Sequence, residues 1–335
     1  MTDPDRPDPV APGGAVADVR RRLGEAVAPV VVGADPVLDA LVVALSVGGH
    51  VLLEGVPGVA KTLVAEATAR ALGARFRRAQ FTPDMLPSDL TGTMTLREGE
   101  LAFRPGPVFT NLLLADEINR TPPKTQAALL EAMGEGQVTV DGTPRRLAEP
   151  FLVVATQNPI EHEGTYPLPE AQLDRFLLKV EVGYPSEADE AALLGLARRG
   201  LAPAALADVA PIVTPDAAGE TVAAVAELAA ALRAEVDATT VAPEVASYLL
   251  AVVRATRDLP SVEVGASPRA GVHLMAASRA TARLAGRDFV TPDDVVAVAP
   301  PVLGHRLVLR AEAELDRFRP ADAVAAAVAT VPVPR

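Results

Sequence analysis

GVPGVAKT, residues 55–62, is the stretch of sequence that decides the fold. An apolar run precedes it at residues 51–53 and apolar residues recur at helical spacing after it, which predicts a strand, a loop and a helix. Glycine-permissive backbone can point several N–H donors inward, and a helix N-terminus attracts negative charge. The stretch therefore predicts a phosphate-binding loop. Its expected nucleotide contacts are Gly55, Val56, Pro57, Gly58, Val59, Ala60, Lys61, Thr62 and Leu63.

Two side chains of this loop carry chemistry. The Lys61 ammonium is expected against the β and γ phosphates of ATP, and the Thr62 hydroxyl is expected to complete the ligand shell of a Mg²⁺ ion. One residue departs from the usual G-x-x-x-x-G-K-[ST] pattern, because Ala60 stands where glycine is usual and brings a methyl group close to the phosphates. Other parts of the chain must therefore support the assignment.

Composition narrows the class of protein. The 335 residues allow two domains, and the absence of cysteine excludes disulfides and thiolate metal sites. A formal net charge of −12 disfavours non-specific binding to nucleic acid. No apolar run approaches the roughly twenty residues of a membrane span, so we expect a soluble cytoplasmic protein. Beyond Mg²⁺ we expect no metal site, since the histidines are scattered: His50, His162, His273 and His305.

The predicted fold class is α/β, a P-loop NTPase αβα core with a parallel sheet and inserted β-hairpins, followed by a small all-α lid domain. Apolar runs at 111–117, 151–156 and 177–182 are typical of strands buried in a parallel sheet, and turn residues predict hairpins at 93–103 and 137–147. Apolar residues at helical spacing predict helices from near residue 16 and from near residue 222, and another helix that Asp35 caps. Further helices are expected to start at Ser267 and Thr291. We expect a disordered tail at 1–14, the ATPase core at 15–199, a linker at 200–215 and the lid at 216–335.

Polar side chains end two of the predicted strands. Asp116 and Glu117 close the run at 111–117, and Asn158 follows the next strand. Ligands gather at the carboxyl ends of parallel strands, so these side chains are expected to meet the phosphate loop. Asp116 is a candidate to hold a water of the Mg²⁺ ion, Glu117 to polarise the attacking water, and Asn158 to orient that water.

Three arginines are candidates for neutralising the charge on the γ-phosphate during hydrolysis: Arg120, Arg175 and Arg269. A guanidinium in that position accelerates hydrolysis by roughly 10³ to 10⁵ in well-studied GTPases. An arginine is more often part of a surface ion pair, so the sequence leaves the choice among the three open.

Five segments together resemble the MoxR family of AAA+ ATPases, including its alanine before the loop lysine. They are GVPGVAKT, LLLADEINR, PPKTQAALLEAM, VVATQNPIEHEGTYPLPEAQLDRF and GASPRA, and the resemblance runs from about residue 31 to about residue 310. It implies a ring, expected to be a hexamer, in which each ATP lies between two subunits. It also implies that Asn158 is sensor 1, Arg269 is sensor 2 on the lid, and Arg175 is the arginine finger, with Arg120 as a rival finger. The hairpins resemble those of helix-2-insert and pre-sensor-1-insert AAA+ proteins, and are expected to face the ring pore or a client.

The resemblance further implies a motor that hydrolyses ATP with Mg²⁺ to remodel or mature a protein client, expected to be a partner with a von Willebrand factor A domain. The adenine base is expected against Val32 and Gly33. Three alternatives stay open. One is the ATPase subunit of a metal chelatase, which carries similar inserts. Another is a nucleotide-gated switch that barely hydrolyses, against which Glu117 and Asn158 argue, and the third is a DNA motor, which the net charge disfavours.

Overall fold

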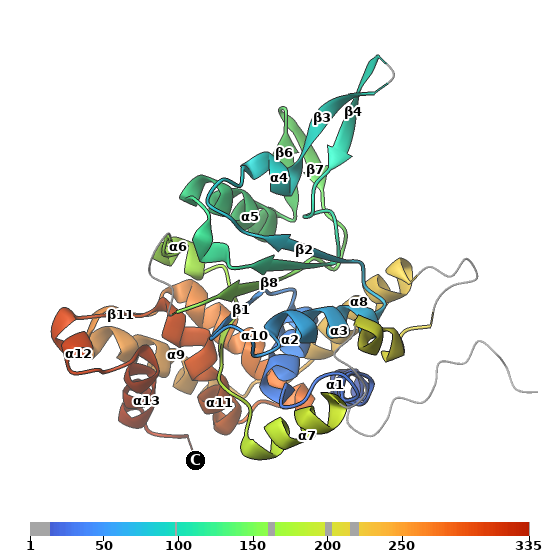
Figure 1. Ribbon diagram of the computed structural model, residues 1–335. Coiled ribbons are helices and arrows are strands. Elements are labelled where there is room, and N and C mark those ends of the chain that lie inside the picture. The colour runs from blue at the N-terminus through green and yellow to red at the C-terminus, as the bar shows by residue number, and fades with distance from the viewer. Residues whose placement is uncertain (1–13, 98, 160–164, 198–202, 215–220, 335) are drawn as a thin grey trace, which may run out of the picture.

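The computed structural model describes residues 14–97, 99–159, 165–197, 203–214 and 221–334. At its centre lies a five-stranded sheet whose paired strands all run parallel, in the order β2-β5-β8-β1-β9 (Figure 1). The strands are β1 (Val51–Gly55), β2 (Phe76–Gln80), β5 (Leu112–Asp116), β8 (Leu152–Gln157) and β9 (Leu178–Val182). The predicted α/β class is confirmed. The predicted phosphate loop follows β1, which lies between β8 and β9 in the sheet.

Successive residues of the central strands enter two separate apolar cores. In β5, Leu112 and Leu114 face the first core and Leu113 faces the second, because side chains alternate along a strand. The first core contains α1 (Gly14–Val27), α2 (Asp35–Val47) and α3 (Lys61–Leu72), and the second contains α4 (Pro87–Thr91) and α5 (Pro123–Glu135). A sheet that is apolar on both faces is thus covered by helices on both faces (Figure 1).

The start of the chain differs in two details from the expectation. The cap predicted for α2 was wrong, since Ala34 is the N-cap, and Asp35 instead accepts a hydrogen bond from Arg20 Nη2 at 2.6 Å. Helix α1 already begins at Gly14, while the rest of the expected tail, residues 1–13, lies outside the described residues. The expected apolar stripe of α1 is buried, at Val16, Val19, Leu23 and Val27.

Two β-hairpins project from the sheet on the side of α4 and α5 (Figure 1). The first pairs β3 (Gly92–Arg97) with β4 (Glu100–Pro105), and the second pairs β6 (Gln137–Val140) with β7 (Thr143–Arg146). Asp141 and Gly142 both have positive φ, as the two-residue turn between β6 and β7 requires. The Arg145 guanidinium stacks on the Phe103 ring, 3.8 Å from its centroid, and so joins the two hairpins. Both predicted hairpins are confirmed.

The C-terminal part is helical, as predicted. Ser267 caps α10 by accepting a hydrogen bond from the Ala270 amide, and Thr291 forms a capping box with Asp294 at the start of α11. The helices are α8 (Val222–Asp237), α9 (Pro243–Asp258), α10 (Pro268–Leu284), α11 (Pro292–Leu303), α12 (Ala311–Leu315) and α13 (Pro320–Thr330), with a short ribbon of β10 (Val262–Val264) and β11 (Val308–Leu309). They share the first apolar core with α1 and α2, so this helical part packs directly on the α/β part of the chain.

Shorter elements connect these parts: 3₁₀ turns η1 (Ile118–Arg120), η2 (Pro203–Asp208) and η3 (Gly304–Arg306), and helices α6 (Glu170–Leu173) and α7 (Glu187–Ala197). Ser186 and Asp189 form a capping box at the start of α7. The described part of the expected linker lies against the core, since Val209 is buried and the Ile212 amide donates to the Ala71 carbonyl at 2.6 Å. Within the described residues, no helix is long and apolar enough to cross a membrane.

Candidate functional site

The backbone of the phosphate loop is held in an unusual conformation. Gly58 has a φ of +87°, and Ala60, the residue that departs from the usual pattern, has a φ of +59° and is the N-cap of α3. Glycine adopts positive φ without cost, whereas a residue with a Cβ is strained there. Gly55 has a different reason to be glycine, because a Cβ on it would lie 2.2 Å from the Val182 carbonyl of the neighbouring strand.

Lys61 folds back over the loop that precedes it. Its ammonium donates to the Gly55 carbonyl, and to the Val56 carbonyl at 3.0 Å. Burial lowers the pKa of Lys61, and the nearby carboxylates of Asp116 and Glu117 oppose that effect. The amine thus lies at the point where a phosphate group would compete with two backbone carbonyls for it.

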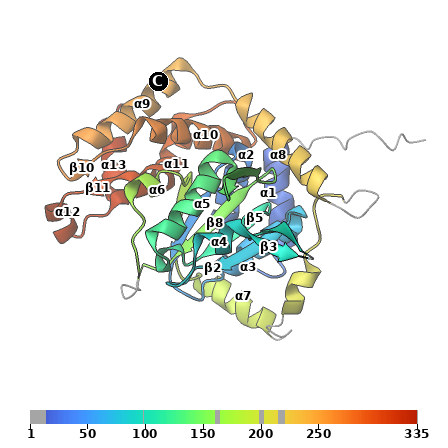
Figure 2. The same ribbon diagram turned by 90° about the horizontal axis from the view of Figure 1, so that it is seen from above.

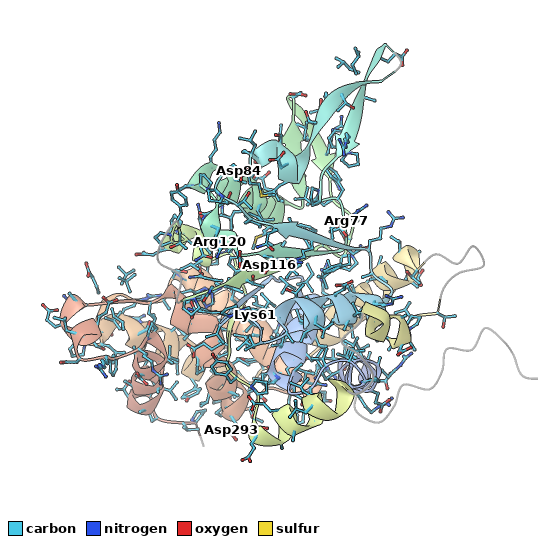
Figure 3. All side chains as sticks on the ribbon, in the orientation of Figure 1. Lys61, Arg77, Asp84, Asp116, Arg120 and Asp293 are labelled. Atoms are coloured by element: carbon cyan, nitrogen blue, oxygen red, sulfur yellow. The ribbon has the colours of Figure 1, made fainter. Side chains whose placement is uncertain are left out.

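A cavity of about 350 Å³ joins the loop to the ends of β5 and β8. Figure 3 shows Lys61 and Asp116 close together at the sheet, with Arg120 beside them. The lining residues are Pro57, Gly58, Val59, Ala60, Lys61, Thr62, Leu63, Asp116, Glu117, Thr156, Gln157 and Asn158. The structure therefore brings together the loop, the two carboxylates and the asparagine that the sequence singled out.

Thr156 organises the two carboxylates. Its hydroxyl donates to Asp116 Oδ1 at 2.6 Å and accepts from the Glu117 amide at 2.9 Å. Glu117 has a φ of +57°, a strained conformation of the kind that clusters at functional sites. Asp116 and Thr62 line the same cavity and offer the oxygen ligands that Mg²⁺ prefers.

Strand β2 adds two side chains that sequence reasoning missed. Arg78 donates to Asp116 Oδ2 through Nη2 at 2.6 Å and through Nε at 3.1 Å, and Gln80 donates to Glu117 Oε2 at 2.7 Å. Arg78 also donates to Gln80 Oε1 at 2.8 Å, so the two pairs form one network. The missing signal was the strand itself, because its sequence, FRRAQ, is too polar to be recognised as one.

A second cavity of about 200 Å³ adjoins the first through Val59, Ala60 and Lys61. Val32 and Gly33, the expected neighbours of the adenine base, line it, together with Tyr184 and Pro185 before α7. A larger cavity of about 830 Å³ lies between α2, β9 and α11, but its described lining includes neither the loop residues nor Asp116 and Glu117.

The three candidate arginines differ in their position relative to these two cavities. Arg120 pairs with Glu117, Nε to Oε2, at 3.2 Å. Neither Arg175 nor Arg269 is among the described residues that line these two cavities, and Arg175 Nη1 donates to the Ala171 carbonyl at 2.8 Å. Buried Arg306 ties the surroundings of these two arginines together, as its guanidinium donates to Asp174 Oδ1 at 2.8 Å and to His273 Nδ1 at 2.5 Å.

The described histidines do not form a metal site. Within the described part of the chain, no group of three or more His, Asp or Glu side chains could hold a metal ion. His50 is buried, with its ring between the Met133 carbonyl and the Val153 amide, and His305 is buried against the Phe176 carbonyl. His162 lies outside the described residues.

Two protein families match separate parts of the chain. The family "ATPase family associated with various cellular activities (AAA)" matches residues 50–178, and the "AAA lid domain" family matches residues 254–327. The chain is 44% identical to Chaperone MoxR1 of Mycobacterium tuberculosis, over 97% of this chain and 86% of that protein, and 46% identical to the uncharacterized protein YeaC of Bacillus subtilis, over 95% and 96%. The crystal structure of a putative ATPase from Cytophaga hutchinsonii superposes with a TM-score of 0.84 at 38% identity, over 96% of this chain and 97% of that chain.

Proposed function

The chain belongs to the MoxR family of AAA+ ATPases, and we propose that it binds ATP with Mg²⁺, hydrolyses it, and uses the reaction to remodel or mature a protein client. The observation that carries this proposal is the cavity in which the loop at residues 57–63 faces Asp116, Glu117 and Asn158. A phosphate loop alone can bind a nucleotide. A loop that faces two carboxylates and an amide can also activate a water molecule beside the γ-phosphate.

Each side chain of the cavity has a proposed task. Lys61 would exchange the loop carbonyls for the β and γ phosphates. Thr62 would hold the Mg²⁺ ion and Asp116 one of its waters, and the ion would supply positive charge against the phosphates. Glu117 accepts a proton from the attacking water, and Asn158 orients that water through its amide. Val32 and Gly33 contact the adenine base in the adjoining cavity.

We assign the arginine finger to Arg175 and sensor 2 to Arg269, with both acting on the ATP of a neighbouring subunit. Neither residue lines the cavities described for its own chain, which supports a role in trans. Arg120, the rival finger, is engaged by the catalytic carboxylate of its own subunit. This assignment requires a closed ring, which we propose to be a hexamer.

The hairpins are the proposed client-contacting elements. They project away from the body of the molecule, and the first carries two leucines, Leu96 and Leu101, that are cross-strand partners and are 73% and 70% exposed (Figure 1). The name of one relative, Chaperone MoxR1, supports the proposal that this chain acts on a protein client. We propose a client or partner with a von Willebrand factor A domain. Affinity capture with a Glu117→Gln variant in ATP should retain it, and a capture that is unchanged when ADP replaces ATP would contradict the proposal.

Two substitutions test the site directly. Lys61→Ala should abolish binding of MgATP measured by calorimetry, and Glu117→Gln should keep binding while turnover falls roughly 10²- to 10⁴-fold, the usual contribution of a general base. The exposed residues Lys124 and Glu135 provide matched controls, Lys124→Ala and Glu135→Gln, that should leave both quantities unchanged. Parent turnover in both site variants would remove the site assignment.

A mixing experiment tests the action in trans. Arg175→Ala subunits keep a complete loop, and Lys61→Ala subunits keep a finger, so mixed rings should regain ATPase activity that neither variant has alone. Absence of recovery in assemblies shown to contain both chains would favour Arg120 or a role in cis.

A further inference from the structure

Helix α7 has an exposed surface of apolar and acidic side chains, and no described residue of the chain covers it. All its described side chains from Glu187 to Leu194 are exposed except Asp189, which is half-buried. Leu194 is 73% exposed, and Glu187, Glu190, Ala191 and Leu194 follow the spacing of a single helical face. Water solvates such a face poorly around its leucine and alanine, so it is suited to contact another protein surface.

A groove of about 700 Å³ between α8, α9 and α10 has the complementary character. Its apolar floor includes Leu250 and Val272, which are 56% and 67% exposed. Four arginines border it against a single carboxylate: Arg233, Arg254, Arg257 and Arg279 against Asp237. Within the described ranges none of these four arginines forms an ion pair, although the whole chain carries a net charge of −12.

We propose that the exposed face of α7 in one subunit docks into the lid groove of a second copy of this chain. The acidic residues of α7 meet the arginines of the groove, and Leu194 meets its apolar floor, which is the helix-in-groove mode of recognition. In Figure 2, α7 lies on the opposite side of the molecule from α9 and α10. Two different complementary patches on opposite sides produce a head-to-tail contact, which closes into a ring when the rotation fits.

This contact bears on the proposed catalytic site, and the inference rests on the ring proposed above. Pro268 lines the groove, and Arg269 is the next residue of the chain. In the subunit that donates α7, Tyr184 and Pro185 of the second nucleotide cavity lie just before that helix. Docking therefore brings Arg269 of one subunit towards the nucleotide of the next. A nucleic acid fits the groove less well, because phosphates would pair with the arginines but leave the apolar floor without a partner.

Charge reversal tests the contact. In a Glu117→Gln background with ATP, one chain carries Glu187→Arg and Glu190→Arg, and a second carries Arg254→Glu and Arg279→Glu. The control carries Glu312→Arg and Glu314→Arg on α12, where both carboxylates are exposed. Sedimentation velocity should show that the background chain and the control assemble alike, while each reversed chain self-associates roughly 100-fold more weakly because like charges then face each other. An equimolar mixture of the two reversed chains should assemble, since every contact again joins opposite charges.

A pair of leucine substitutions gives a second readout. Leu194→Ala should weaken assembly about tenfold, and Leu315→Ala, at an 83% exposed leucine of α12, should not. Reversed chains that assemble like the parent, or a mixture that assembles no better than its components, would overturn the docking while leaving the ring intact. Retention of DNA by the groove with unchanged assembly would also overturn it. A background chain that stays monomeric with ATP would overturn the ring itself, and the docking with it.

Discussion

Replacing Ala60 by glycine tests whether the phosphate loop stores backbone strain. Ala60 has φ +59° and ψ 19°, the left-handed helical region, where a residue with a Cβ is disfavoured by about 1–2 kcal/mol. Glycine removes that cost but loses about 0.4–1 kcal/mol through the greater freedom of the unfolded chain. The methyl group is exposed, so its removal sacrifices little packing. The difference between these two ranges runs from about 0 to 1.6 kcal/mol, so we expect Ala60→Gly to stabilise the protein by about 0.8 kcal/mol.

Urea unfolding of a small matched series measures this difference. Ala238 supplies the control, since it is exposed at the end of α8 with φ −75°, and glycine there should destabilise by about 0.4–1 kcal/mol. Ala60→Val should be the least stable of the set, because a β-branched side chain at positive φ is a genuine outlier. If Ala60→Gly destabilises the protein as much as Ala238→Gly does, the loop is not strained and the reasoning fails. Repeating the series with MgATP shows whether the conformation matters for binding.

Three further predictions concern individual polar side chains. Burial lowers the pKa of His50 to about 4, so protonation of His50 favours the unfolded chain. In urea unfolding, this group should lower stability by about 1 kcal/mol between pH 6.5 and pH 5.5, and His50→Asn should remove that part of the pH dependence. Gln80→Leu removes the hydrogen bond that restrains the Glu117 carboxylate. Basal ATPase turnover should then rise about fivefold, which is the equivalent of about 1 kcal/mol. A fall in turnover would mean that Gln80 holds Glu117 in its productive position. Arg306→Met leaves the Asp174 carboxylate without its buried partner and should cost about 3–5 kcal/mol of unfolding free energy, and adding Asp174→Asn should recover part of it.

The sequence predicted what depends on apolar patterning and on local backbone chemistry. Strand β5, LLLAD, is buried at every residue, and its pattern is readable because both faces of the sheet are covered. Ser267 and Thr291 cap helices as expected, since capping needs only the residues of one turn. The sheet edge was harder to read. Strand β2 has one buried residue, Ala79, and two arginines, a pattern that resembles a loop as much as a strand.

The missed strand also explains the missed part of the site. Arg78 and Gln80 reach the two carboxylates only because β2 pairs with β5 in register, with Gln80 opposite Asp116. No spacing along the chain connects residue 80 with residue 117, so that network becomes visible only in three dimensions. The predicted cap at Asp35 was wrong for a local reason. An aspartate before proline suits both the cap and the first turn of a helix, and the hydrogen bond from Arg20 favours the first turn.

The cations around the cavity indicate why assembly should control catalysis. Arg78 is engaged by Asp116 and Arg120 by Glu117, so these two guanidiniums neutralise carboxylates of their own chain. Lys61 differs from both, since it bonds to loop carbonyls that a triphosphate can replace. Charge that spreads over the γ-phosphate during transfer then calls for a further cation, which we expect from a neighbour. Arg306 joins Asp174, the residue before Arg175, to His273 on the helix that begins beside Arg269, so a movement of the lid would shift both arginines together. On this argument the contact between subunits, more than the affinity of the loop for ATP, sets the rate of hydrolysis.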